Sequence, residues 1–286
     1  MRIRSLQIAL ALSCTLLATA ASAAKIEDKA AKKPFADADH VIYFPVRGAI
    51  VPKAGQLVNH GGPVITSAKV VFIFWGPSFS NAASPDFAYA TTLQAFRNLF
   101  GSTPEFNTIT QYSGILLTSL GAGTADLFDT STPPTNVTDA IVRSKVQSYL
   151  TSQAFDNSTI YEVVLPASSY SSSGTSTSCG GPSLSYCAYH GHFTNGGNDV
   201  KYSIEPYPSC GGCKVAGWTD VQNQEHFVCH ETREAVTDPD LNAWFDRSGQ
   251  EADDKCAWSP TPFIGTGGYG YQYEWSNAAR TCVKTR

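Results

Sequence analysis

The chain has 286 residues, with 20 Lys and Arg against 24 Asp and Glu, which gives a formal net charge of −4. This acidity argues against nucleic acid or an anionic membrane as a partner. The length suits one large domain or two modest ones.

The N-terminus predicts export from the cell. Arg2 and Arg4 precede an apolar run, residues 6–17, that is too short to span a bilayer, and Ala21-Ser22-Ala23 provides the small residues of a cleavage site. We therefore predict a signal peptide over residues 1–23 and a mature soluble chain that is secreted or periplasmic. Residues 24–59 lack strong periodicity, and we expect a leader or a partly ordered arm, with an inhibitory role left open.

The compact domain is expected to cover residues 60–286. Residues 69–76 form a continuous apolar run rich in β-branched and aromatic residues, which is typical of a strand covered on both faces. A helix is expected over residues 85–100, where apolar side chains recur at helical spacing. The order of strand and helix then repeats: we expect a short strand at 115–117, a helix over 138–150 and a buried strand at 160–165. Alternating strands and helices predict an α/β fold, with a mixed sheet packed by helices in a single disulfide-bonded domain.

The second half of the chain is expected to be less regular. Residues 168–178 are rich in Ser, Thr and Gly and predict a flexible loop. Residues 200–204 alternate as an edge or hairpin strand does. A helix capped by Thr219 or Asp220 should end before Pro239, because proline cannot continue it. Residues 271–275 predict a last strand, locked by Cys282.

The cysteines fit an oxidising compartment. Seven remain once Cys14 leaves with the signal peptide. Local loop closure suggests three bridges: Cys179 with Cys187, Cys210 with Cys213, and Cys256 with Cys282. Cys229 remains, and we interpret it as a small buried hydrophobe rather than a thiolate ligand or nucleophile.

The stretch from His230 to Glu234 predicts a metal site. Residues four apart project from the same face of a helix, so His230 and Glu234 can grip one cation, while Glu231 can act as general base toward a water bound to that cation. A surface helix is the alternative interpretation of such a short motif. Apolar Phe227 and Val236 flank the motif and favour a buried helix, where ionised side chains need a partner or a metal.

This motif resembles the His-Glu-x-x-His helix of thermolysin-like gluzincins. The resemblance implies a third ligand from a following helix, at Glu251 or Asp254, with Asp246 a further acidic candidate. Glu234 stands where that family has its second histidine. Zn²⁺ is expected from the resemblance. The additional carboxylate makes the site harder and more oxygen-rich, which lowers its preference for Zn²⁺ over Mn²⁺ or Ca²⁺ and makes these ions the alternatives.

A second resemblance covers most of the chain from His60 onward. Its segments are His60-Gly61-Gly62-Pro63-Val64, Trp75-Gly76, Cys187-Ala188-Tyr189-His190, the Cys210 to Cys213 pair, Glu234-Ala235-Val236-Thr237-Asp238-Pro239, Trp244, Asp246, Gly249 and Cys256-Ala257-Trp258. They resemble bacterial exported proteins related to plant phosphate-induced protein 1 (EXORDIUM). The plant branch is associated with the extracellular matrix and generally lacks the His-Glu helix, which implies that the fold can form without a metal.

Four other residues are candidates near the metal. His226 lies one turn before His230 and would be a strained ligand. His190 and His192 are expected on a loop, and either could supply a further ligand or stabilise an oxyanion. Asp240 lies ten positions after His230, where metzincin-like proteases place their third ligand.

These observations predict a secreted, zincin-like, metal-dependent peptidase or hydrolase. His230, Glu234 and Glu251 would bind the ion, Glu231 and His190 would be catalytic, and a peptide or protein substrate is implied by the resemblance alone. The alternative is a non-catalytic extracellular matrix or carbohydrate-binding protein whose acidic residues bind a structural ion or none.

Overall fold

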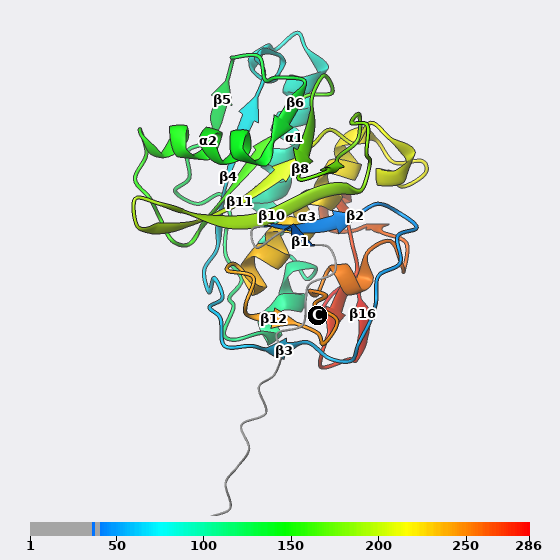
Figure 1. Ribbon diagram of the computed structural model, residues 1–286. Coiled ribbons are helices and arrows are strands. Elements are labelled where there is room, and N and C mark those ends of the chain that lie inside the picture. Colours follow the sequence, from blue (N-terminus) through cyan, green and yellow to red (C-terminus); the bar gives the residue numbers. More distant parts are fainter. Residues whose placement is uncertain (1–35, 38–40) are drawn as a thin grey trace, which may run out of the picture. The chain divides into compact units, whose positions relative to one another are not determined.

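The computed structural model of the chain describes residues 36–37 and 41–286 (Figure 1). The predicted signal peptide, residues 1–23, lies outside the described residues. In the part of the chain that is described, no helix is both long and apolar enough to cross a membrane.

The centre of the fold is a seven-stranded mixed sheet. Strands β11, β7, β4 and β5 pair in parallel, whereas β10 pairs antiparallel with both β11 and β2, and β1 pairs antiparallel with β2. In spatial order the strands are β1 (Ala36–Asp37), β2 (Val41–Pro45), β10 (Tyr186–Asn195), β11 (Asn198–Glu205), β7 (Thr159–Val164), β4 (Lys69–Trp75) and β5 (Leu127–Asp129).

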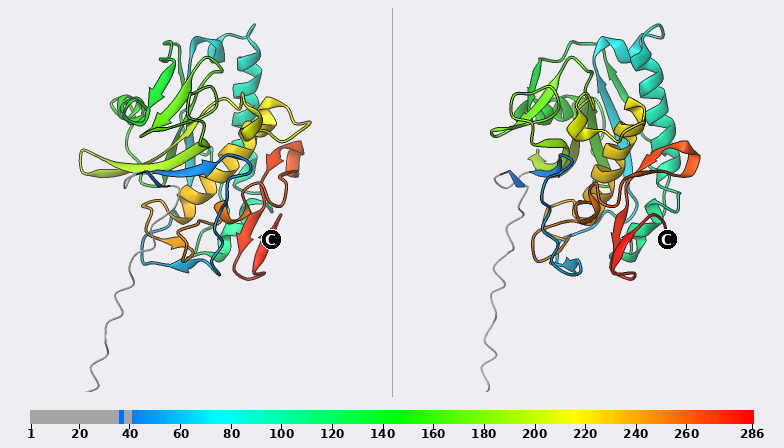
Figure 2. Two further views of the ribbon diagram at one scale, coloured as in Figure 1. Left: turned by 45° about the vertical axis from the view of Figure 1, so that its right-hand side comes forward. Right: turned by 90° about the vertical axis from the view of Figure 1, so that its right-hand side faces the viewer.

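Helices cover both faces of this sheet (Figures 1 and 2). Side chains of α1 (Pro85–Phe100) and α3 (Asp220–Thr237) share one core with Val70, Phe72 and Phe74 of β4. Side chains of α2 (Asp139–Leu150) share a second core with Val71 and Ile73 of the same strand. Because successive side chains of β4 enter opposite cores, nearly every position of that strand is apolar, as the sequence indicated. The predicted α/β class is confirmed.

Several small elements complete the chain, which therefore has more sheets than the single one predicted. The short helical turns are η1 (Pro77–Ser80), η2 (Phe106–Gln111), η3 (Gly211–Cys213), η4 (Asp254–Cys256) and η5 (Thr266–Gly268). The two-stranded sheets pair β12 (Trp244–Phe245) with β3 (Val58–Asn59), β13 (Phe263–Ile264) with β14 (Gly270–Tyr271), and β15 (Glu274–Ser276) with β16 (Thr281–Val283). The remaining sheet contains β6 (Asn136–Thr138), β8 (Tyr170–Ser173) and β9 (Ser176–Thr177).

Three predictions about local structure were wrong. Residues 115–117 form no strand, because only Ile115 is buried and its two neighbours point to solvent. The predicted flexible loop over 168–178 contains β8 and β9, and hydroxyl groups explain the difference: the Ser178 hydroxyl accepts a hydrogen bond from the backbone N–H of Ser171 at 2.8 Å. The compact fold also begins before residue 60, since β2 is buried along its whole length and pairs with β10.

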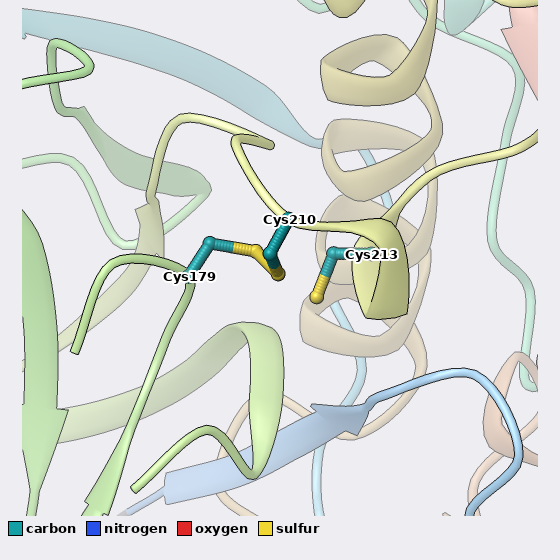
Figure 3. Close-up of side chains that lie close together, drawn as sticks. All are labelled: Cys179, Cys210 and Cys213. Atoms are coloured by element: carbon teal, nitrogen blue, oxygen red, sulfur yellow. A yellow bond between two sulfur atoms is a disulfide. The ribbon is translucent and has the colours of Figure 1, made fainter. Parts of the chain in front are cut away.

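The disulfides join neighbouring segments instead of closing the shortest loops. Cys179 is bonded to Cys210, and Cys187 to Cys213, so both local pairings predicted for these four residues were wrong. Each bridge ties the chain around the start of β10 to the loop before α3, and the Cys213 side chain lies beside the first bridge (Figure 3).

The remaining cysteine predictions are confirmed. Cys256 is bonded to Cys282, and Cys229 is free and buried. Burial raises the pKa of the Cys229 thiol to about 12, which keeps it protonated and unsuited to bind a metal as a thiolate. The three bridges are compatible with an extracellular protein.

Candidate metal centre

Helix α3 carries the central residues of the site, and its start is fixed by a capping box. The Thr219 hydroxyl accepts a hydrogen bond from the N–H of Gln222 at 3.2 Å, and the Gln222 side chain accepts one from the N–H of Thr219 at 3.0 Å. The helix then runs to Thr237 before Asp238 and Pro239. Every residue from Asn223 to Thr237 is buried, so His230, Glu231 and Glu234 are enclosed by protein on a helix that the sheet and the C-terminal segments cover.

The sheet presents a polar row to this helix. In the strand register His190 of β10 is opposite Ser203 of β11, which is opposite Glu162 of β7. Paired residues of adjacent strands point to the same face. His190 reaches α3, where its Nδ1 lies 3.1 Å from Glu231 Oε2. At the far end of the row, the Thr232 hydroxyl donates to Glu162 Oε1 at 2.7 Å.

Two histidines from different elements approach the same carboxylate oxygen. His230 Nε2 lies 3.2 Å from Glu234 Oε2, and His190 Nδ1 lies 3.7 Å from that same oxygen. The other oxygen, Glu234 Oε1, accepts a hydrogen bond from the backbone N–H of Asp254 at 2.9 Å. Glu234 thus joins helix α3, strand β10 and the loop around η4.

That loop brings two further acids to the histidines. Asp254 Oδ1 lies 3.8 Å from His230 Nε2, and Glu251 Oε2 lies 3.6 Å from His190 Nε2. The side chains of His190, His230, Glu231, Glu234 and Glu251 are 0% exposed and that of Asp254 is 1% exposed. The predicted ligands His230, Glu234 and Glu251 and the predicted catalytic residues Glu231 and His190 therefore lie in one buried cluster. Glu251 is nearer to His190, and Asp254 is nearer to His230.

Gln272 orients His230 from the side opposite the acids. Its side-chain N–H₂ donates to the carbonyl of Asp253 at 2.7 Å, so its carbonyl Oε1 faces His230 Nδ1 at 3.3 Å. Because an amide oxygen only accepts, Nδ1 carries the proton of a neutral His230 and Nε2 turns a lone pair toward Glu234 and Asp254.

A glycine allows Gln272 to come this close. A Cβ at Gly270 would lie 2.2 Å from the backbone oxygen of Gln222 in α3. Gly270 also donates its N–H to Glu225 Oε2 at 2.7 Å. The sequence did not predict Gln272 as a site residue, because it lies far from α3 along the chain and belongs to no motif.

Burial dominates the electrostatics of the centre. Desolvation lowers the pKa of His230, although Asp253 and Asp254 oppose this change. Desolvation also raises the pKa of Glu231 well above its usual range, and the neighbouring carboxylates of Glu205 and Glu234 raise it further. Both effects disfavour charged side chains in a protein interior unless a cation or protons balance the carboxylates.

Two basic residues near the centre, Arg233 and Lys255, are engaged with other acids. Arg233 forms buried ion pairs with Asp253 and, at 2.7 Å, with Glu274. Lys255 Nζ lies 2.5 Å from Asp246 Oδ2, and Asp246 also accepts the N–H groups of Ala54 and Ser248. Asp246, a candidate from the sequence, is therefore occupied in shaping the loop before Glu251.

The remaining candidates lie outside the cluster. His226 Nε2 is 2.9 Å from Gln272 Oε1, and burial lowers the pKa of His226 to about 3, so it is a neutral neighbour that shares the amide of Gln272. His192 and Asp240 form a separate, partly exposed group with Asp199. Lys201 pairs with both of those aspartates, so this second group already contains its own cation.

An aromatic wall closes one side of the cluster. The ring of Phe44 in β2 stacks on His230 with centroids 4.1 Å apart, and the ring of Trp258 also stacks on Phe44, at 5.2 Å. Hydrophobic cover of this kind excludes water and strengthens electrostatic interactions inside it.

Comparison of this chain with models of known protein families, with curated proteins and with solved structures found no match in any of the three. The likenesses to the gluzincin helix and to the EXORDIUM family therefore stay predictions.

Proposed function

We propose that this chain is a secreted metal-dependent hydrolase of zincin-like architecture, with peptides or proteins as its substrates. The observation that carries the proposal is the convergence of His230, Glu234 and Asp254, which can each offer one ligand atom within 4.8 Å of the others. We assign the ion to these three residues, with Zn²⁺ first and the harder Mn²⁺ and Ca²⁺ as alternatives.

The chemistry of the donor set fits a cation. His230 Nε2 is buried and makes no hydrogen bond, yet it faces Glu234 Oε2 at 3.2 Å. A lone pair directed at a carboxylate is repulsive, and a second proton on this histidine is opposed by its burial. A divalent cation between the nitrogen and the oxygens removes the repulsion.

Such an ion would supply Lewis acidity toward a carbonyl and would make a water a better nucleophile. The protein would supply the proton acceptor. Glu231 Oε1 is buried without a hydrogen bond, while Glu231 Oε2 is held 3.1 Å from His190 Nδ1. A carboxylate with one such oxygen beside the ion is placed to accept a proton from that water.

Complete burial of the cluster favours a second candidate function. A substrate reaches side chains that are 0% exposed only if part of the cover moves. A non-catalytic extracellular protein with a structural ion needs no such opening, since closed metal sites contribute directly to folding.

Elemental analysis with a casein or peptide-library assay separates these functions. We expect wild type to hold a divalent ion and to hydrolyse peptides, and His230→Ala to lose the ion at His230 together with the activity. We expect Glu231→Gln to lose hydrolysis by about 10²-fold or more while keeping the ion at His230. Glu225→Gln, a buried glutamate earlier on the same helix, is the matched control and should keep both properties. Full activity in Glu231→Gln would refute the catalytic role, and an ion without hydrolysis in wild type would support the structural one.

A further inference from the structure

The buried cluster contains two possible ligand groups that share one residue. The first is His230, Glu234 and Asp254, and the second is His190, Glu231 and Glu234. Within each group the ligand atoms lie within 4.8 Å of one another, and Glu234 belongs to both. The shared carboxylate comes from helix α3, and the two histidines come from α3 and from strand β10.

We propose that this centre binds two divalent cations bridged by Glu234, the second of them held by His190 and Glu231. This inference rests on the proposed function, because it assigns a second ion to the same site. Carboxylate-bridged ion pairs in proteins have their ions about 3.5–4 Å apart. Glu234 Oε2 lies 3.2 Å from His230 Nε2 and 3.7 Å from His190 Nδ1, so both histidines reach the bridging carboxylate.

The orientations of the two histidines support a pair of ions. His230 turns Nε2 toward Glu234 and turns Nδ1 toward Gln272 Oε1 at 3.3 Å. His190 has the opposite arrangement, because its Nδ1 faces Glu231 and Glu234 while its Nε2 faces Glu251 Oε2 at 3.6 Å. In each ring one nitrogen is directed at the shared oxygen, and the other is directed at an acceptor that can fix the tautomer, as is usual for metal-binding histidines.

Charge balance gives an independent argument. Glu231, Glu234, Glu251 and Asp254 are carboxylates that are at most 1% exposed, and the neighbouring Arg233 and Lys255 are paired with Asp253 and Asp246. Two divalent cations would match the charge of these four groups when all are ionised, whereas a single cation would require two of them to hold protons.

A second ion at His190 leaves the proposed chemistry of Glu231 in place. Its Oε2 faces His190 at 3.1 Å and would contact the ion, while its Oε1 is buried and makes no hydrogen bond. Glu231 Oε1 therefore stays available as the proton acceptor. Two ions could also stabilise charge on both sides of a scissile bond.

The test counts ions in the full mature chain after chelation and reloading with Mn²⁺ alone. We expect two Mn²⁺ per chain by elemental analysis and native mass spectrometry, and a spin-coupled pair in the electron paramagnetic resonance spectrum of wild type, which requires no variant to fold. His190→Ala should hold one ion and give the uncoupled spectrum of a single Mn²⁺. His192→Ala, two residues along the same strand, is the matched control and should keep two coupled ions.

The outcomes separate this inference from the proposed function. One ion per chain in wild type would overturn the two-ion centre and leave the single-ion hydrolase standing. Two uncoupled ions, one of which is lost in His192→Ala, would also overturn the inference, because the second ion would then lie in the His192, Asp199 and Asp240 group. Binding of no ion would refute both proposals.

Discussion

Replacing Gln272 with leucine tests whether ligand orientation controls the affinity of the metal centre. The Gln272 amide accepts from His226 Nε2 at 2.9 Å and from His230 Nδ1 at 3.3 Å, and it donates to Asp253. Leucine has a similar volume but removes the acceptor that fixes the tautomer of His230. Loss of such a partner typically weakens metal binding about 10–100-fold. The corresponding loss of binding free energy is about 1.4–2.7 kcal/mol.

The assay is calorimetric titration of the chelated protein with Zn²⁺, together with thermal unfolding of the same samples. Gln224→Leu is the matched control, because Gln224 is a buried glutamine whose amide is hydrogen-bonded to Tyr89 and Glu205. We expect both variants to lose stability, since each leaves buried polar groups unpaired. Only Gln272→Leu should lose affinity for Zn²⁺. If Gln272→Leu binds the ion as tightly as Gln224→Leu, the proposed orientation of His230 is refuted.

Three further predictions concern stability. Burial raises the pKa of Glu225 from 4.5 to about 7; its folded state therefore binds the proton more tightly than the unfolded state, and its contribution to stability is complete below pH 4.5 and is lost as the pH rises through 7. At about 1.4 kcal/mol per pKa unit, the free energy of unfolding of Glu225→Gln minus that of wild type should be about 3 kcal/mol larger at pH 8 than at pH 4.5. Equal differences in urea titrations at both pH values would contradict this. Phe72→Ala should lower the free energy of unfolding by about 3–5 kcal/mol, because the ring is fully buried and its removal leaves a cavity; a loss below about 1 kcal/mol would mean that the core refills. Replacing Cys256 and Cys282 with serine should cost about 3–4 kcal/mol through loss of a bridge with a sequence separation of 26 residues, and an unchanged denaturation midpoint would show that the bridge adds nothing.

The regular part of the fold could be predicted because the local sequence pattern agrees there with the burial of the same residues in the folded chain. Helix α1 begins at Pro85, after the Ser84 cap, and ends before Gly101, as the apolar spacing indicated. Strand β4 is apolar at nearly every position because both of its faces are covered. Strand β2 has a similar apolar run, but it is short and follows an unpatterned segment, so its place beside β10 depended on pairing that no local pattern encodes.

The site could be predicted only as far as one helix extends. Helical geometry brings His230 and Glu234 to one face, and the two side chains lie 3.2 Å apart. His190 was expected on a loop, yet it lies inside β10, where the register with β11 directs it at α3. The choice between Glu251 and Asp254 depends on a loop whose path is set by the buried pair of Asp246 and Lys255, and such tertiary pairings leave no trace in residue spacing.

The stacking of Phe44 on His230 has a practical consequence for recombinant production. A shortened version that begins at the predicted boundary, residue 60, would omit β2 and with it the ring that covers one face of the His230 imidazole. It would also expose the edge of β10, a strand that could then pair with a second molecule. Expression plasmids should therefore start upstream of Val41, with any affinity tag placed before that strand.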